Sequence, residues 1–301
     1  MSNSFEYYLV AAFSDRPFGG NPAIVAFLDP TNTPESILCD VASTFKQPMT
    51  VFLSEDPCSP ADEATKRFLV RYFTAEEETP LCVHATLAAA HVIFRTKRTV
   101  EGPEIESLEF VTRTHGVIVA RRVDSEYSRW MEIEIDAGDV TEVSNSERER
   151  IVGIINDAFG KTLSVQHVAK GTGKYEHCLV VEVDEKDDIK NCQVTGGRLG
   201  KETGYLINAI TARSSGRNEH FASRVFVPFD SLGGEDHVCG SAHAVLGPYW
   251  TIRQALLDGE EIRAIHVGRR GGDLRLFWTR GQPRIRIRGE AVTIANGVCS
   301  F

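Results

Sequence analysis

Two short stretches of this 301-residue sequence place a cysteine at the start of a predicted helix. The first, residues 79–91, has Cys82 directly before an alanine-rich run. The second, residues 237–247, has Cys239 in the same setting about 157 residues later. A thiol at a helix N-terminus lies among backbone N–H groups without a helical partner, at the positive end of the helix dipole. We therefore expect both thiols to have lowered pKa values and to form thiolates readily.

Two such elements facing one another would perform acid–base chemistry at carbon. Racemisation needs a base that removes a proton and a conjugate acid on the opposite face that returns one, and a thiolate with a thiol meets that need. The N–H groups of two helix N-termini would bind a carboxylate and stabilise the carbanion-like transition state. Small carboxylates such as amino acids or hydroxy acids are the substrate class that fits.

The composition is that of an ordinary globular protein, with 42% hydrophobic and 25% charged residues. A net charge of −9 argues against nucleic acid or an anionic membrane as the main partner. The sequence has no apolar run long enough to span a bilayer, and its N-terminus lacks the pattern of a signal peptide. Seven cysteines without Cys-x-x-Cys spacing indicate neither zinc nor a disulfide framework, so we expect a reduced, cytoplasmic protein with no metal site.

The elements that must position the two cysteines can be read from periodicity and turn residues. Besides the two cysteine elements, helices are predicted over residues 34–45 and 146–158, the latter opened by Ser146 with Glu149 at capping-box spacing. Strands are predicted over residues 5–13, 23–28, 47–53, 68–73, 107–112, 116–121, 130–135, within 161–184, and over 204–211, 224–227, 263–267, 274–278, 284–288 and 291–295.

The order strands, loop, cysteine, helix, strands therefore occurs twice. It predicts an α+β protein of two similar domains, each a curved, barrel-like sheet wrapped around one central helix. We place the N-terminal domain at residues 1–124, completed by 287–301, and the C-terminal domain at residues 125–286. His91 and His243 fall inside the central helices, where core or supporting roles are expected.

Four stretches carry a resemblance to a known family: DRPFGGNPA (residues 15–23), PLCVHATLA (80–88), FASRVFVP (221–228) and EDHVCGSAH (235–243). They resemble the phenazine-biosynthesis PhzF-like family of the diaminopimelate epimerase and proline racemase superfamily. The resemblance implies two barrel domains, an active site in the cleft between them, no cofactor, and often a homodimer. It also implies isomerisation of a small molecule by moving a proton.

The resemblance assigns roles to individual positions and shows departures. His84, Asp236 and Ser241 match family residues that hold substrate or assist proton transfer. In PhzF-like isomerases a glutamate shuttles the proton, and the matching position here holds Met49, which cannot transfer protons. The family's glycine after the first cysteine is Val83, and its usual threonine before Gly-Ser is Cys239. Both positions are cysteine in the two-base racemases of the superfamily.

Three hypotheses follow from these residues. The first is a cofactor-independent racemase or epimerase with Cys82, Cys239 and Asp236 as catalytic residues. Its substrate would be held by five residues of the motifs, namely Asn21, His84, Ala85, Gly240 and Ser241. The second is a PhzF-like isomerase or cyclase in which Asp236 and His84 replace the missing glutamate. The third is a catalytically degenerate member that binds a small molecule or a protein without turnover.

Overall fold

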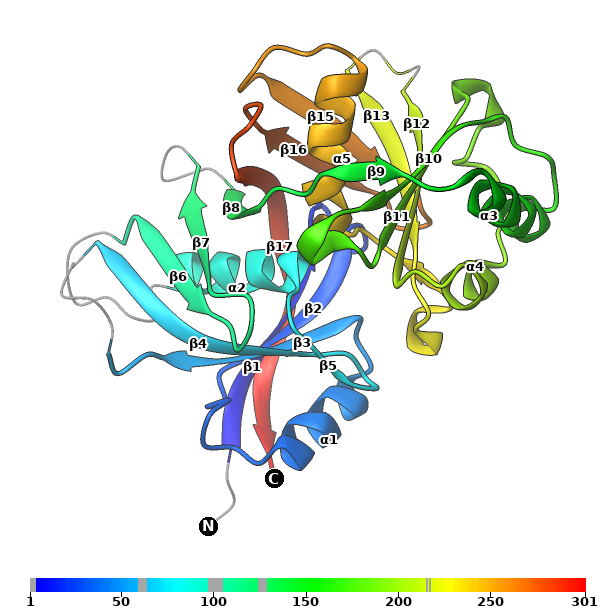
Figure 1. The fold of residues 1–301 in the computed structure, drawn as a ribbon. Helices are drawn as coiled ribbons and strands as arrows, with labels where there is room; N and C mark the ends of the chain where they lie inside the picture. The colour runs from blue at the N-terminus through cyan, green and yellow to red at the C-terminus, as the bar shows by residue number, and fades with distance from the viewer. Residues whose placement is uncertain (1–3, 59–63, 97–104, 124–128, 215, 217) are drawn as a thin grey trace. The chain divides into compact units, whose positions relative to one another are not determined.

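The computed structural model describes residues 4–58, 64–96, 105–123, 129–214, 216 and 218–301 (Figure 1). The chain forms two compact units. Unit 1 comprises Met1–Ile135 with Arg288–Phe301, and unit 2 comprises Asp136–Ile287. The predicted boundary between residues 124 and 125 lies outside the described residues.

Unit 1 is a closed barrel of eight strands in the order β1–β2–β3–β4–β6–β7–β8–β17, with β17 paired back to β1. A short strand, β5, adds to the end of β4. The bounds are β1 (Ser4–Ala12), β2 (Asn21–Ala26), β3 (Met49–Glu55), β4 (Thr65–Phe73), β5 (Glu78–Thr79), β6 (Ser107–Val111), β7 (Val117–Arg122), β8 (Trp130–Asp136) and β17 (Arg284–Ser300).

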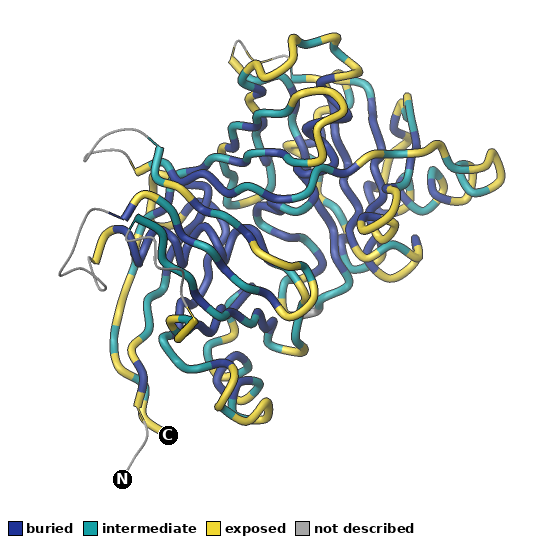
Figure 2. Tube along the Cα trace, turned by 60° about the vertical axis from the view of Figure 1, so that its left-hand side comes forward, coloured by how far each residue is buried: buried dark blue, intermediate teal, exposed yellow. Residues whose placement is uncertain are grey.

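One helix of unit 1 is central and one is peripheral. Helix α2 (Val83–Thr96) is buried on every side from Val83 to Phe94, which its apolar and small residues permit. Helix α1 (Glu35–Phe45) buries only one face, which packs against Phe52 and Phe73 in a separate core cluster. Figure 2 shows this mixture of buried and exposed residues along α1. No helix of the described chain is long and apolar enough to cross a membrane.

Unit 2 repeats this plan around helix α5 (Gly240–Arg253). Its strands follow the order β9–β10–β11–β12–β13–β15–β16, and β14 adds to the end of β13. Helices α3 (Asn145–Phe159) and α4 (Gly196–Glu202) share a second core cluster with β11. The strand bounds are β9 (Val140–Glu142), β10 (Val165–Gly171), β11 (Cys178–Val183), β12 (Ile207–Arg213), β13 (Phe221–Phe226), β14 (Glu235–Asp236), β15 (Glu261–His266) and β16 (Gly272–Phe277).

The pairing pattern makes the two units structural repeats. In unit 1, β2 and β3 pair in parallel, β4 returns antiparallel to β3, and β6 pairs in parallel with β4 after the chain has passed through α2. In unit 2, β11, β12, β13 and β15 show the same directions, with α5 as the connecting helix. The predicted fold, an α+β protein of two similar units each wrapped around a central helix, is confirmed.

The repeat extends to a part-buried ion pair. Arg71 on β4 binds Glu78 on β5 through two nitrogens, at 2.9 and 2.6 Å, and its guanidinium lies 5.0 Å from the centre of the Phe73 ring. Arg224 on β13 binds Glu235 on β14 through two hydrogen bonds of 2.7 Å, and lies 5.3 Å from the Phe226 ring. Each pair fixes the short strand that leads into a central helix.

Three local predictions are wrong. Helix α3 begins one residue earlier than predicted, and its cap is Ser144, whose hydroxyl accepts the Glu147 N–H at 3.3 Å. The strand predicted from residue 204 starts at Ile207, because the glycine-rich residues 196–202 form α4. The two strands predicted over 284–288 and 291–295 are one continuous strand, β17.

We predict that Arg224→Met destabilises unit 2 by about 1 to 3 kcal/mol, because it leaves the part-buried Glu235 carboxylate without its buried partner. It also removes donors from the carbonyl groups of Ile189 and Cys192, which Arg224 binds at 3.0 and 2.7 Å. Urea unfolding followed by circular dichroism measures the change. The exposed i,i+4 pair Arg198–Glu202 supplies the control, since Arg198→Met should leave the unfolding curve nearly unchanged. Equal destabilisation by both substitutions would contradict the assignment.

Candidate functional site

Cys82, His84 and Asn21 form one hydrogen-bonded cluster at the N-terminus of α2. Asn21 is the first residue of β2 and follows Gly20, whose φ is +59°. A Cβ at Gly20 would lie 2.1 Å from the Ala12 carbonyl oxygen, so glycine is required for the chain to enter β2 here. The Nδ1 atom of His84 lies 3.1 Å from Asn21 Nδ2 and 3.2 Å from Cys82 Sγ, and all three residues are buried.

The direction of these bonds depends on the tautomer of His84. The Nδ1 atom of a neutral His84 ring has one lone pair when the ring proton is on Nε2, and it can accept from the Asn21 amide or from the Cys82 thiol but not fully from both. With the Asn21 side-chain oxygen turned toward the ring, Nδ1–H of an imidazolium would donate to that oxygen. His84 is therefore placed to take the thiol proton, which would leave a thiolate beside an imidazolium.

Cys239 and Asp236 form the corresponding pair in unit 2. Cys239 is the N-cap residue of α5, Asp236 ends β14, and both are buried. Burial first, and then the nearby charge of Asp236, which is also hydrogen-bonded to the thiol, hold the pKa of Cys239 well above its ordinary value of 9.0. The backbone N–H of Ala242 acts in the opposite direction and is outweighed. Cys239 is thus a protonated thiol at neutral pH.

The predicted lowering of the Cys239 pKa is therefore wrong. The reasoning from the sequence counted the helix N-terminus, which does act in the expected direction through Ala242. It could not count burial, because the depth of the cysteine depends on how the strands of unit 2 close around α5. Desolvation disfavours a thiolate more strongly than one backbone donor favours it.

Met49 opens β3 on the barrel wall and is buried. Its sulfur accepts a hydrogen bond of 3.7 Å from the Thr79 hydroxyl. Thr79 stands three residues before Cys82, as Asp236 stands three residues before Cys239. Unit 1 therefore has a hydroxyl where unit 2 has a carboxylate.

The residues predicted to bind substrate lie in the first turns of the two central helices, apart from Asn21. His84 and Ser241 occupy the same position of the repeat, two residues after the cysteine. Ala85 and Gly240 are buried, and Ser241 is half-buried. In unit 1 the structure brings Asn21 and His84 into contact with Cys82. In unit 2 it brings Asp236 into contact with Cys239. The other three residues, Ala85, Gly240 and Ser241, lie in the first helical turns that follow the two cysteines.

Reasoning from the sequence missed one neighbour of Cys239. Cys178, the first residue of β11, is buried, and desolvation raises its pKa to about 12. A negative charge on the Cys178 thiolate would oppose ionisation of Cys239. No local pattern marks Cys178, because only the pairing of β11 with β12 brings it to this end of unit 2. In the described part of the chain, no group of three or more His, Cys, Asp or Glu side chains is arranged to hold a metal ion.

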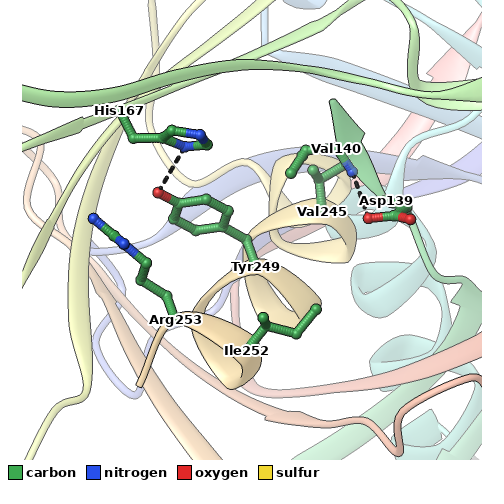
Figure 3. Close-up of a pocket in the computed structure, with 8 residues that line it drawn as sticks. Asp139, Val140, His167, Val245, Tyr249, Ile252 and Arg253 are labelled. Carbon is green, nitrogen blue, oxygen red and sulfur yellow. Dashed lines mark hydrogen bonds between the residues drawn. The ribbon is translucent and has the colours of Figure 1, made fainter. Parts of the chain in front are cut away.

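A separate cavity of about 270 Å³ lies along the C-terminal half of α5 (Figure 3). Tyr249 stands at its centre, its hydroxyl 3.1 Å from Nδ1 of His167, with the two rings stacked 5.7 Å apart. The same hydroxyl donates to the buried carboxylate of Glu182, which also accepts from Arg253 Nε at 2.8 Å. None of the residues predicted from the sequence lines this cavity.

Asp236→Asn should lower the pH at which Cys239 reacts with a thiol reagent. A neutral amide removes the carboxylate that opposes the thiolate, so we expect the midpoint of the rate profile to fall by about one pH unit or more. Peptide-resolved mass spectrometry after brief alkylation measures the rate at each pH, and the exposed Cys58 serves as an internal reference. An unchanged midpoint would show that Asp236 does not act on this thiol.

Comparison with known proteins gives a consistent result. The family model described as phenazine biosynthesis-like protein, PhzC-PhzF, matches residues 10–297. The chain is 33% identical to an uncharacterized isomerase of Pseudomonas aeruginosa over 97% of both chains. It is 32% identical to mouse phenazine biosynthesis-like domain-containing protein 2, over 96% of this chain and 97% of the mouse protein.

Solved structures agree with these matches. A phenazine biosynthesis PhzF family protein from Enterococcus faecalis superposes with a TM-score of 0.77 at 26% identity, covering 99% of both chains. A hydroxyproline epimerase from Agrobacterium vitis shares the fold at 9% identity, with a TM-score of 0.60 and coverage of 99% and 91%. The motifs, the repeated barrel and the match along nearly the whole sequence place this chain in the phenazine biosynthesis-like PhzC-PhzF family, an isomerase-like family.

Proposed function

We propose that this protein is a cofactor-independent isomerase that moves a proton at a carbon atom of a small carboxylate, as a racemase or epimerase with Cys82 and Cys239 as its acid–base pair. One observation carries the proposal. Each unit of the repeat has a buried thiol at the N-terminus of its central helix, next to a group that can accept the thiol proton. The family resemblance places a proton-shuttling glutamate at one position, and this chain has the apolar Met49 there, so another group must move the proton.

The side chains next to the two thiols favour different protonation states of Cys82 and Cys239 before the reaction. His84 lies 3.2 Å from the Cys82 thiol and would take its proton, so Cys82 would act as the base. Cys239 is held as a thiol by burial and by Asp236, which makes it the resting acid. In one direction the Cys82 thiolate takes a proton from the substrate carbon and the Cys239 thiol returns one. The reverse reaction exchanges the roles, with Asp236 assisting deprotonation of Cys239.

The substrate carboxylate would be bound at the helix N-termini. Backbone N–H groups in the first turns of α2 and α5, including those of Ala85, Gly240 and Ser241, supply donors and the positive end of each dipole. Asn21, His84 and Ser241 would bind the other polar groups of the substrate. The absence of a lysine or arginine from these five positions favours a small neutral or zwitterionic carboxylate over a multiply charged anion.

A second candidate uses the same residues without a catalytic Cys239. The raised pKa of Cys239 leaves little of it as the thiolate at neutral pH, while the adjacent Asp236 carboxylate could accept a substrate proton directly. The protein would then be a PhzF-like isomerase or cyclase that uses Asp236 and His84. A third candidate, a member that only binds its ligand, is motivated by Met49 and by Val83 at the usual glycine position.

We also propose that the protein works in the cytoplasm as a homodimer. All seven cysteines are free thiols, which suits a reducing compartment. The dimer is proposed from the family resemblance, and light scattering coupled to size-exclusion chromatography measures it.

We predict that wild-type protein incubated in D₂O with a panel of L-amino acids and hydroxyprolines inverts one of them and introduces deuterium at the inverted carbon. Cys82→Ser and Cys239→Ser should each reduce inversion by about a hundredfold or more, the size expected for loss of an acid or base. Chiral chromatography with mass spectrometry follows both quantities.

Cys192→Ser is the matched control, because the Cys192 thiol binds the carbonyl oxygens of Asp187 and Asp188 rather than a group at either helix N-terminus. It should invert at the wild-type rate. Retained activity in Cys239→Ser together with loss in Asp236→Asn would favour the second candidate. Thermal stabilisation by a panel compound without deuterium uptake would favour the third.

A further inference from the structure

The residue four positions after each capping cysteine binds the backbone carbonyl of that cysteine. In unit 2 this residue is His243, whose Nδ1 lies 2.7 Å from the carbonyl oxygen of Cys239. A carbonyl oxygen only accepts, so Nδ1 carries the ring proton. In unit 1 the residue is Thr86, whose hydroxyl donates to the carbonyl oxygen of Cys82 at 2.8 Å. Two chemically different side chains make the same contact.

Each of these residues is anchored at its other end by a buried polar side chain on a strand of the same barrel. The hydroxyl of Thr86 lies 2.6 Å from that of Tyr72 on β4. His243 Nε2 lies 3.3 Å from the Ser223 hydroxyl on β13, the strand that corresponds to β4 in the repeat. Because Nε2 of His243 has no proton, Ser223 is the donor. The chains of contacts are therefore Tyr72–Thr86–Cys82 and Ser223–His243–Cys239.

Packing alone does not account for these polar pairs. Thr86, Ser223 and His243 are fully buried, and Tyr72 is nearly so. The rest of each barrel interior is dominated by apolar side chains. A buried hydrogen-bonded pair contributes little net stability compared with apolar side chains of the same volume. The anchoring residues stand two positions apart on equivalent strands, yet in both units the pair ends on the carbonyl of the cysteine, which points to a role there.

We propose that Thr86 and His243 are positioning residues that fix the capping cysteines, so that each thiol stays against its own proton-accepting partner. The inference rests on the proposed function of Cys82 and Cys239. A cap residue turns about its backbone bonds, and a second hydrogen bond to its carbonyl restricts that turning. For Cys239 the bond holds the thiol beside Asp236 rather than letting it swing toward solvent.

The titratable neighbours of Cys239 do not compete for this role. Asp236 on β14 and Cys178 on β11 both oppose ionisation of the thiol. Burial lowers the pKa of His243 to about 4, so the ring is neutral from weakly acidic to alkaline pH. The bond from Nδ1 to the Cys239 carbonyl is therefore present over the whole range in which the thiol is titrated.

The test compares His243→Val with His243→Thr, two side chains of the same shape. Threonine can bind the carbonyl four residues back, as Thr86 does in unit 1, and valine cannot. The rate of Cys239 modification by methyl methanethiosulfonate is measured between about pH 7 and about pH 11 by peptide mass spectrometry. Cys82 in the same sample is the internal control. Circular dichroism melting verifies that each variant is folded.

In His243→Val the midpoint for Cys239 should fall by about one pH unit relative to His243→Thr, because the released thiol leaves Asp236 and gains solvent. The Cys82 profile should not change. The reciprocal substitution Thr86→Val should change the Cys82 rate by about threefold or more and leave Cys239 unaffected, whereas Thr86→Ser should match wild type. If the valine and threonine variants at 243 give the same Cys239 profile, or if both cysteines shift together, the inference is wrong. These measurements use no substrate, so they stand even when the exchange assay finds none.

Discussion

Burial of one helix inside each barrel is the constraint on which the rest of the structure depends. Helices α2 and α5 have small or apolar side chains on nearly every side, so neither can lie on a surface. The strands must close around them, and each helix then has its unpaired backbone N–H groups only at its N-terminus. In both units a cysteine stands at that terminus. The packing of the fold and the position of the two buried thiols therefore have one origin.

The same burial sets the character of the two thiols. At Cys239 it outweighs the helix N-terminus, and the carboxylate of Asp236 adds to it, so the thiol stays protonated. At Cys82 the neighbour is the imidazole of His84, which also contacts the amide of Asn21. A symmetric fold thus carries an asymmetric pair, one thiol beside a base and one beside a carboxylate. The proposed isomerisation uses this asymmetry, with Cys82 as the base and Cys239 as the acid.

Much of this could be predicted from the sequence, and the failures have physical causes. The repeated order of strands, cysteine and helix predicts the two units, because periodicity and small residues report burial directly. The sign of the Cys239 pKa shift could not be predicted, since it depends on a balance between desolvation and one backbone donor. Cys178 and the bond from Ser223 to His243 also escaped, because strand pairing between distant segments creates them. Helix α4 was missed because glycine-rich residues seldom signal a helix.

The most direct measurement of the central claim is hydrogen exchange at the substrate carbon with each enantiomer supplied separately to each cysteine variant. Two thiols on opposite faces predict that Cys239→Ser still exchanges the hydrogen of one enantiomer, through Cys82, and no longer that of the other. Cys82→Ser should show the opposite preference, and neither variant should invert its substrate. Equal exchange of both enantiomers by either variant, or inversion that survives in one of them, would contradict the account.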